Sequence, residues 1–196
     1  MVIGVTGGTG SGKSTLCNFA RELGFFIIDA DKIGHEILLS GKPAYNKAVK
    51  CFGEQILSPN SEIDRKKLGR IVFSNKGKLM LLNEITHKEI ASEVDSLIKS
   101  CNNEKIILDA AVLFESGMDR ICDYTIAVIA PKDDRLKRVM LRDMADENSV
   151  LARMQSQNDD VYYTNKADAT IVNDGDLKDL YKKMAKVLAE VGCDKD

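Results

Sequence analysis

Short apolar runs alternate with amphipathic segments along most of the chain, and this alternation predicts the order of strands and helices. Runs rich in Val, Ile and Phe are typical of buried strands, whereas apolar residues three and four apart indicate one face of a helix. The expected strands are residues 2–6, 25–29, 105–109, 124–129 and 169–173. Strands that alternate with helices favour an α/β fold, a mostly parallel five-stranded sheet with helices on both faces.

The spacing between the expected strands is uneven. The 75 residues from 30 to 104 show helical patterns almost throughout, far more than a minimal crossover between parallel strands needs. Pro43 and Gly53 bracket one helix, Asp64 caps another, and residues 75–100 form a long one. We expect a helical insertion at the carboxyl ends of the strands, where ligands bind in open α/β sheets. The expected division is a core of residues 1–30 and 105–196 and an insertion of residues 31–104.

The segment Gly7–Ser14 is a complete G-x-x-x-x-G-K-[ST] phosphate-binding loop. It follows the strand at residues 2–6 and precedes a helix expected over residues 15–23, which is the context that the motif requires. Its glycines let backbone N–H groups turn inward around phosphates, and the helix directs its positive end to the same point. Lys13 is expected at the terminal phosphates, with the Ser14 hydroxyl on Mg²⁺. The alternative is a glycine-rich turn without function, which the complete match disfavours.

Composition indicates which partners and which compartment to expect for this protein. Of 196 residues, 30% are charged and 44% hydrophobic, and the net charge of −2 gives no reason to expect a nucleic acid or a membrane as partner. Five cysteines without a C-x-x-C pair fit a reducing compartment better than disulfides or zinc. No leader-like or membrane-spanning apolar run is visible, so we expect a cytoplasmic protein, either a monomer or a small homo-oligomer.

Two short patterns resemble parts of a GTPase. Residues 165–168 match N-K-x-D and residues 31–34 match D-x-x-G. In a GTPase, however, the first element leaves the end of a strand, whereas here it precedes one. The second follows the loop lysine too closely to leave room for a switch segment. The sequence therefore disfavours a GTPase.

Phosphoryl transfer to a small molecule needs carboxylates near the loop. Asp29 and Asp31 follow the second strand, and alternation places them on one side if strand geometry persists that far. The alternative for either residue is that it caps the next helix. Asp109 ends the third strand, where other phosphate-loop proteins hold a magnesium-bound water, although it could also be a turn residue.

A helix expected over residues 131–145 carries a row of arginines. Arg135, Arg138 and Arg142 fall on one face of it. Such a row is often only a solvated face, but a kinase needs a mobile cationic lid over the phosphates. We therefore expect a lid at about residues 131–160, to which Arg153 and Gln157 also belong.

These motifs together resemble the dephospho-CoA kinase family over nearly the whole chain. The loop has the form T-G-G-x-G-S-G-K-S and is followed by I-D-A-D. Further matches are Asp64–Leu68, Leu82–His87, Leu113–Gly117, Arg138–Asp143, Arg153–Gln157, Ala167–Asp168 and Ile171–Gly175. The resemblance implies ATP-dependent phosphorylation of the ribose 3′-hydroxyl of dephospho-CoA, the last step of coenzyme A synthesis, with ATP and dephospho-CoA as partners and Mg²⁺ as cofactor.

The resemblance also implies roles for individual residues. Asp31 corresponds to the catalytic base and Arg142 to the lid arginine at the phosphates, and Lys13 completes the catalytic set. The expected ATP-binding residues are Gly8, Thr9, Gly10, Ser11, Gly12, Lys13, Ser14, Thr15, Arg138 and Asn173. The expected acceptor-binding residues are His35, Arg65, His87, Leu113, Phe114 and Glu115. The expected metal site comprises Ser14 and, through water, Asp109.

Several positions depart from the family pattern. Lys88 and Ala111 stand where prolines are usual, and His35 stands where some members have arginine. Residues 159–165 do not follow the family's lysine-containing spacing. Two other functions stay open at this point, a different phosphate-loop kinase such as a nucleoside monophosphate kinase, and a nucleotide-binding regulatory module.

Overall fold

The computed structural model describes residues 1–193, so the last three residues of the expected core segment lie outside the described part. The chain forms two compact units. The first contains Met1–Ile28 and Asn102–Asp196, and the second contains Asp29–Cys101.

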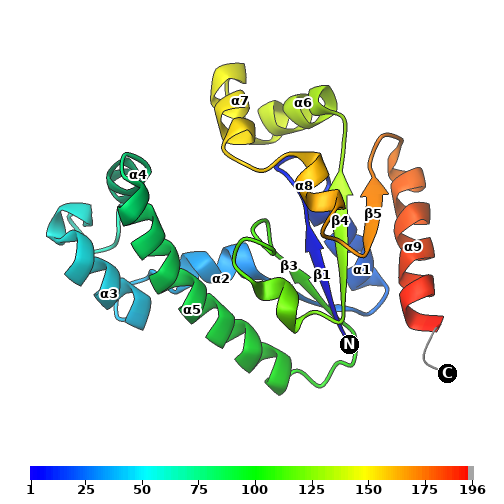
Figure 1. Cartoon of the computed structure of the whole chain (residues 1–196), viewed down its shortest axis with the longest axis horizontal. Coiled ribbons are helices and arrows are strands. Elements are labelled where there is room, and N and C mark those ends of the chain that lie inside the picture. Colours follow the sequence, from blue (N-terminus) through cyan, green and yellow to red (C-terminus); the bar gives the residue numbers. More distant parts are fainter. Residues whose placement is uncertain (194–196) are drawn as a thin grey trace. The chain divides into compact units, whose positions relative to one another are not determined.

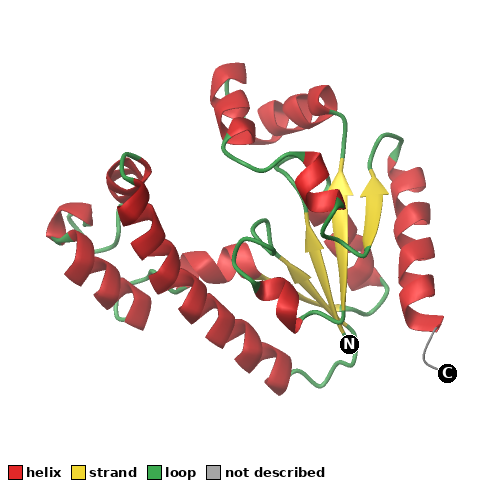
Figure 2. Ribbon diagram, in the orientation of Figure 1, coloured by secondary structure: helices red, strands yellow, loops and turns green. Residues whose placement is uncertain are grey.

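A five-stranded, all-parallel sheet is the centre of the first unit (Figures 1 and 2). Its strand order is β2-β3-β1-β4-β5, which places β1 in the middle. Val5 of β1 is in register with Asp109 of β3, and Thr6 with Ala127 of β4. The strands are β1 (Val2–Thr6), β2 (Phe26–Asp29), β3 (Ile106–Asp109), β4 (Tyr124–Ile129) and β5 (Ala169–Val172). The fold class and all five strands expected from the sequence are confirmed.

Helices follow the strands in the order that the sequence predicts. In this unit they are α1 (Lys13–Glu22), the 3₁₀ turn η2 (Met118–Ile121), α6 (Lys132–Asp143), α7 (Glu147–Gln155), α8 (Asp160–Thr164) and α9 (Leu177–Cys193). The helices α6 and α7 follow the carboxyl end of β4 (Figure 1). Asp176 caps α9 by accepting a hydrogen bond from the Asp179 N–H. None of the helices within residues 1–193 combines the length and apolar character needed to cross a membrane.

Alternate residues of the strands pack on opposite faces of the sheet. On one face, Ile3 and Val5 join a buried cluster with Leu16 of α1 and Met184 of α9. On the other face, a side chain on Gly4 would come within 2.8 Å of Leu113. The absence of a side chain at this central position therefore lets the segment after β3 lie directly on the sheet.

The second unit is helical. It comprises α2 (Ala30–Glu36), α3 (Pro43–Phe52), the 3₁₀ turn η1 (Glu54–Ile56), α4 (Arg65–Phe73) and α5 (Lys76–Ser100). The long helix α5 packs against α2, α3 and α4. Asp64 accepts hydrogen bonds from two backbone N–H groups of α4, and Pro43 occupies the first turn of α3, as the sequence predicts. The caps are local, which is why the sequence locates these helices well.

Three of the boundaries that differ from the expected ones concern residues of the candidate site. The helix α1 begins at Lys13 rather than Thr15, so the end of the phosphate loop is already helical. The strand β2 ends at Asp29 and helix α2 begins at Ala30, so strand geometry does not persist to Asp31. The single helix expected over residues 131–145 ends at Asp143, because Met144 adopts a left-handed conformation with φ 49°.

Candidate active site

The phosphate loop connects β1 to α1 within the first unit. Gly10 and Gly12 have φ angles of 78° and 109°, which only glycine adopts at little cost. Gly12 immediately precedes α1, so Lys13 and Ser14 lie in the first helical turn. This turn contains no acidic side chain that would neutralise the positive end of the helix. The loop therefore has the backbone and the electrostatic field of an anion site.

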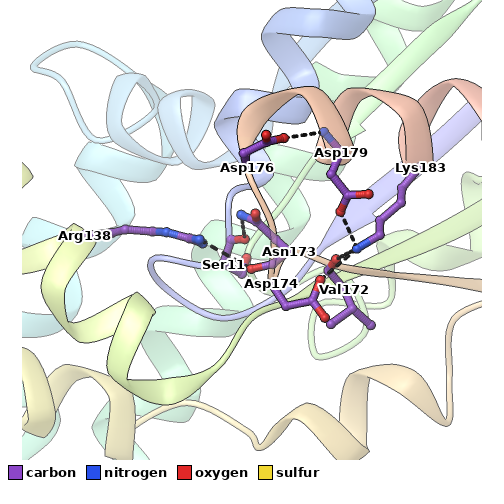
Figure 3. A network of polar contacts seen from close by, with 8 residues as sticks. All are labelled: Ser11, Arg138, Val172, Asn173, Asp174, Asp176, Asp179 and Lys183. Carbon is purple, nitrogen blue, oxygen red and sulfur yellow. Dashed lines mark hydrogen bonds and ion pairs between the residues drawn. The ribbon is translucent and has the colours of Figure 1, made fainter.

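The turn after β5 holds the loop from one side (Figure 3). Asn173 Nδ2 donates a hydrogen bond of 2.7 Å to the Ser11 carbonyl oxygen, and Asn173 N–H donates to the Ile129 carbonyl. Lys183 of α9 binds the Val172 carbonyl oxygen at 2.9 Å and the Asp174 carboxylate at 2.7 Å. Asn173, an expected ATP-binding residue, thus has its side chain buried against the loop.

Two buried polar atoms at this place have no hydrogen-bond partner among the described residues, Arg138 Nη1 and Ser11 Oγ. Arg138 Nη2 lies 3.4 Å from the Asn173 carbonyl oxygen, and Figure 3 shows the guanidinium extending from α6 towards Asn173 and Ser11. A buried guanidinium nitrogen without an acceptor is costly. A phosphate oxygen is the kind of acceptor that would satisfy it.

The structure separates the three arginines of α6. Arg135 is only 6% exposed, Arg138 is half-buried and Arg142 is exposed. Arg142 donates two hydrogen bonds to Asp143, at 2.7 and 3.2 Å, and Arg153 donates a third at 2.6 Å. These hydrogen bonds, first from Arg142 and then from Arg153, hold the pKa of Asp143 well below its usual value of 3.8. The three arginines are therefore not all exposed to solvent, and they do not share one environment from which all three would bind phosphate.

Oxygen ligands suited to Mg²⁺ lie near the loop. Asp109 ends β3 beside Val5 of β1, and the Ala110 N–H donates to the Val5 carbonyl oxygen. Ser14 is exposed at the start of α1. Residues 1–193 contain no cluster of three or more His, Cys, Asp or Glu side chains that could hold a metal by themselves. Phosphate oxygens and water can supply the other ligands of a Mg²⁺ ion that protein side chains hold at one or two positions.

The two aspartates after β2 have different places. Asp29 is the N-cap of α2, and its carboxylate accepts a hydrogen bond of 2.8 Å from the Lys32 N–H. The capping alternative is thus confirmed for Asp29. Asp31 lies in the first turn of α2 and is exposed.

The other expected acceptor residues of the second unit lie on three of its helices. Arg65 Nη2 of α4 is 3.4 Å from the carbonyl oxygen of His35 in α2, which brings these two residues together. His87 lies on α5, the helix that packs against both α2 and α4.

Leu113, Phe114 and Glu115 face three different environments. Leu113 is fully buried against Gly4, so its side chain belongs to the core. The Phe114 ring meets Tyr162 edge to face at 6.4 Å between centroids. Glu115 accepts a hydrogen bond of 2.6 Å from Asn158. The segment after β3 is thereby connected to the segment that includes α8.

The N-K-x-D pattern has structural tasks. Asp168 accepts hydrogen bonds from the Thr125 N–H at 2.8 Å and from its hydroxyl at 2.6 Å, which joins the start of β5 to β4. The Lys166 ammonium lies 4.7 Å from the centroid of the Tyr162 ring and 5.6 Å from that of Phe114. Both charged groups of the pattern are thus engaged within the fold, which agrees with the sequence argument against a GTPase.

Comparison with known proteins distinguishes among the phosphate-loop classes. The sequence profile of the dephospho-CoA kinase family matches residues 1–179. The chain belongs to the dephospho-CoA kinase family. It is 40% identical over 190 residues to the dephospho-CoA kinase of Carboxydothermus hydrogenoformans, covering 95% of this chain and 92% of that one.

Solved structures agree with the family assignment. The dephospho-CoA kinase of Campylobacter jejuni is 33% identical, with a TM-score of 0.71 over 100% of this chain and 98% of that one. The protein TT1252 of Thermus thermophilus is 29% identical, with a TM-score of 0.85 over 97% of both chains. A shikimate kinase of Bacteroides thetaiotaomicron, 15% identical with a TM-score of 0.57 over 97% of both chains, shares the fold.

Sequence reasoning missed contacts of the loop with the α6–α8 region. Thr9 N–H donates to Gln157 Oε1 at 2.8 Å, and Arg135 Nε donates to the Thr9 carbonyl oxygen at 2.9 Å. Arg135 Nη1 also pairs with Asp160 at 3.0 Å. The one available signal was that residues 159–165 depart from the family's spacing, which did not indicate a partner for Arg135.

Proposed function

We propose that this chain transfers the γ-phosphoryl group of ATP to the ribose 3′-hydroxyl of dephospho-CoA, giving coenzyme A. The proposal rests on the phosphate loop, which lies at the N-terminus of α1 and has no acidic residue in the first turn of that helix. Family membership supplies the acceptor, since a phosphate loop alone is common to many nucleotide-binding proteins.

Cations around the loop provide most of the catalysis in this proposal, because phosphoryl transfer depends mainly on positioning and on stabilising negative charge. Lys13 follows the terminal phosphates. The half-buried Arg138 gives a phosphate oxygen its Nη1, which has no hydrogen-bond partner within residues 1–193. Arg142 exchanges Asp143 for phosphate when the lid closes. In that exchange, phosphate oxygens replace the Asp143 carboxylate as acceptors of the two hydrogen bonds that Arg142 donates.

Residues present in the first unit fit Mg²⁺. Ser14 would bind the ion directly, and Asp109 would bind it through a water molecule. When bound, Mg²⁺ neutralises charge on the β- and γ-phosphates. The remaining positions of its coordination shell suit phosphate oxygens and water.

The acceptor belongs to the second unit in this proposal. Asp31 takes the proton of the 3′-hydroxyl as general base, while Asp29 keeps α2 capped. His35, Arg65 and His87 contact dephospho-CoA from three helices. For Phe114 and Glu115, in the segment after β3 of the first unit, a part in acceptor binding stays a prediction from the family resemblance.

We also propose the cytoplasm as the compartment of this reaction. The five cysteines of the sequence include no C-x-x-C pair, and Cys51 and Cys122 are free thiols. Free thiols suit a reducing environment.

Measuring ADP release across a panel of acceptors tests the proposal. The purified protein is given ATP with Mg²⁺ and, in separate reactions, dephospho-CoA, nucleoside monophosphates, shikimate or no acceptor. We expect rapid ADP release with dephospho-CoA alone. Equal or faster release with another acceptor would refute the assignment in favour of a different small-molecule kinase, and ATP binding without acceptor-dependent release would favour a regulatory module.

A further inference from the structure

Both backbone polar groups of Thr9, in the phosphate loop, form hydrogen bonds with side chains of other segments. Its carbonyl oxygen accepts a hydrogen bond from Arg135 Nε at 2.9 Å, and its N–H donates to Gln157 Oε1 at 2.8 Å. Arg135 comes from α6, whereas Gln157 lies between α7 and α8. Two separate segments therefore fix the orientation of this one residue of the loop.

Arg135 is itself anchored. Its side chain is 8% exposed, and its Nη1 forms an ion pair of 3.0 Å with Asp160 in the first turn of α8. A guanidinium that is this deeply buried needs a counter-charge, because a buried unpaired cation is strongly destabilising. Asp159 caps α8 by accepting from the Tyr162 N–H, so Asp160 is not required for that task.

The guanidinium also packs directly against the loop backbone. A Cβ atom on Gly8 would lie 2.2 Å from Arg135 Nη2, so a side chain at position 8 would force the guanidinium to move. Gly8 thus leaves the space that the Arg135 guanidinium occupies beside the loop.

We propose that Arg135 is a positioning residue for ATP, which together with Asp160 and Gln157 holds the Thr9 peptide and keeps the phosphate loop in its binding conformation. The physical reason is preorganisation. A loop that already presents its N–H groups to phosphate loses less conformational freedom on binding than a loop that must first be ordered. This inference rests on the proposed function in one respect, that the loop binds ATP. None of its residues is among those proposed to bind the acceptor.

The test compares Arg135→Gln with Lys137→Gln, a matched loss of charge at an exposed position of the same helix. Titration calorimetry gives the Kd of ATP with Mg²⁺, and steady-state kinetics give KM for both substrates and kcat. We expect Arg135→Gln to raise the Kd and KM for ATP about tenfold or more, the scale of a misplaced binding group. The KM for dephospho-CoA and kcat should stay within about twofold, and Lys137→Gln should match the wild type.

Amide exchange supplies a measurement of the loop itself. Peptides that cover residues 7–12 should exchange faster in free Arg135→Gln than in the free wild type or Lys137→Gln. Unchanged ATP affinity together with unchanged exchange in the loop would overturn the proposal. So would an equal rise of KM for ATP and for the acceptor without faster exchange, because that pattern indicates a general structural defect.

Two further variants keep the proposal testable if Arg135→Gln does not fold. Arg135→Lys keeps the charge, but one ammonium cannot reproduce the fork that reaches Thr9 and Asp160 together, so ATP affinity should fall several-fold. Wild-type ATP affinity in Arg135→Lys would contradict the proposal. Asp160→Asn should weaken ATP binding less than Arg135→Gln does. A folded double variant, Arg135→Gln with Asp160→Asn, should bind ATP as weakly as Arg135→Gln alone. Full additivity of the two losses in binding free energy would refute the role of the ion pair.

Because ATP binding is measured directly, this test is separate from that of the proposed function. A wild-type protein that binds ATP but does not phosphorylate dephospho-CoA would refute the proposed function. The comparison of ATP affinity and loop exchange among the variants would still decide the role of Arg135.

Discussion

The side-chain amide nitrogen of Asn173, Nδ2, donates a hydrogen bond of 2.7 Å to the carbonyl oxygen of Ser11. This contact joins the phosphate loop to the turn after β5. The same amide nitrogen would lie only 2.3 Å from a Cβ atom on Gly12. A side chain at position 12 would therefore push the Asn173 side chain away from Ser11.

The first prediction follows from this fit. Gly12→Ala combines a left-handed φ of 109° with a steric clash against a buried side chain, so both stability and ATP affinity should fall. Gly24→Ala is the matched control, because Gly24 has a φ of 87° but nothing within 4 Å of the added atom. Denaturant unfolding should show a loss of about 1–2 kcal/mol for Gly24→Ala and a larger loss for Gly12→Ala. Equal losses, with normal ATP binding in both variants, would contradict the described contact.

The second prediction separates the two aspartates after β2. Asp31→Asn keeps the volume but removes the base, so kcat should fall about 10²-fold or more while ATP affinity stays nearly unchanged. Asp29→Asn should be mild in both activity and stability, because asparagine caps helices about as well as aspartate. Steady-state kinetics on both variants check this. A folded Asp29→Asn protein with the greater loss of kcat would show that the base is assigned to the wrong carboxylate.

The third prediction concerns Arg142 and the movement of α6 and α7. Amides around residues 138–153 should exchange quickly in the free protein and become protected when ATP and acceptor are both bound. Arg142→Lys should still lower kcat, because an ammonium lacks the planar two-pronged donor geometry of guanidinium. Absence of ligand-dependent protection, combined with normal turnover by Arg142→Lys, would remove the lid from the account and leave the phosphate loop unaffected.

The fourth prediction is a pH dependence. Hydrogen bonds from Arg142 and then Arg153 lower the pKa of Asp143 below 3.8, so the folded state favours its ionised form. The contribution of this carboxylate to stability is present above its unfolded pKa and is lost as the pH falls through the lower folded value. Carboxyl carbon NMR of Asp143 should therefore give a midpoint below 3.8, rising towards that value in Arg142→Gln. A midpoint at or above 3.8 in the wild type would contradict the pairing.

Local sequence signals predicted most of the fold. The strands were recognisable because each is a short apolar run, and the helices of the second unit because Pro43, Asp64 and Asn75 mark their beginnings. The loop was recognisable because its glycines, lysine and serine are adjacent in the chain. In each case the residues that determine the structure lie within a few positions of one another.

What could not be predicted depends on contacts between distant residues. Helical spacing placed Arg135 and Arg142 on one face, but only tertiary structure pairs Arg135 with Asp160 and with Thr9, 25 and 126 residues away. Burial therefore differs along the row although the spacing is regular. Similarly, the pattern after β2 offered both Asp29 and Asp31 as caps, and the end of the strand at Asp29 decided which one serves.

The fifth prediction tests the central claim most directly, by identifying the product. The purified protein is incubated with ATP, Mg²⁺ and dephospho-CoA, and the product is analysed by mass spectrometry and phosphorus NMR. The account predicts one added phosphate on the ribose 3′-oxygen and one ADP for each molecule formed, with no product from a folded Lys13→Ala variant. A product phosphorylated elsewhere, no product from the wild type, or normal turnover by Lys13→Ala would contradict it.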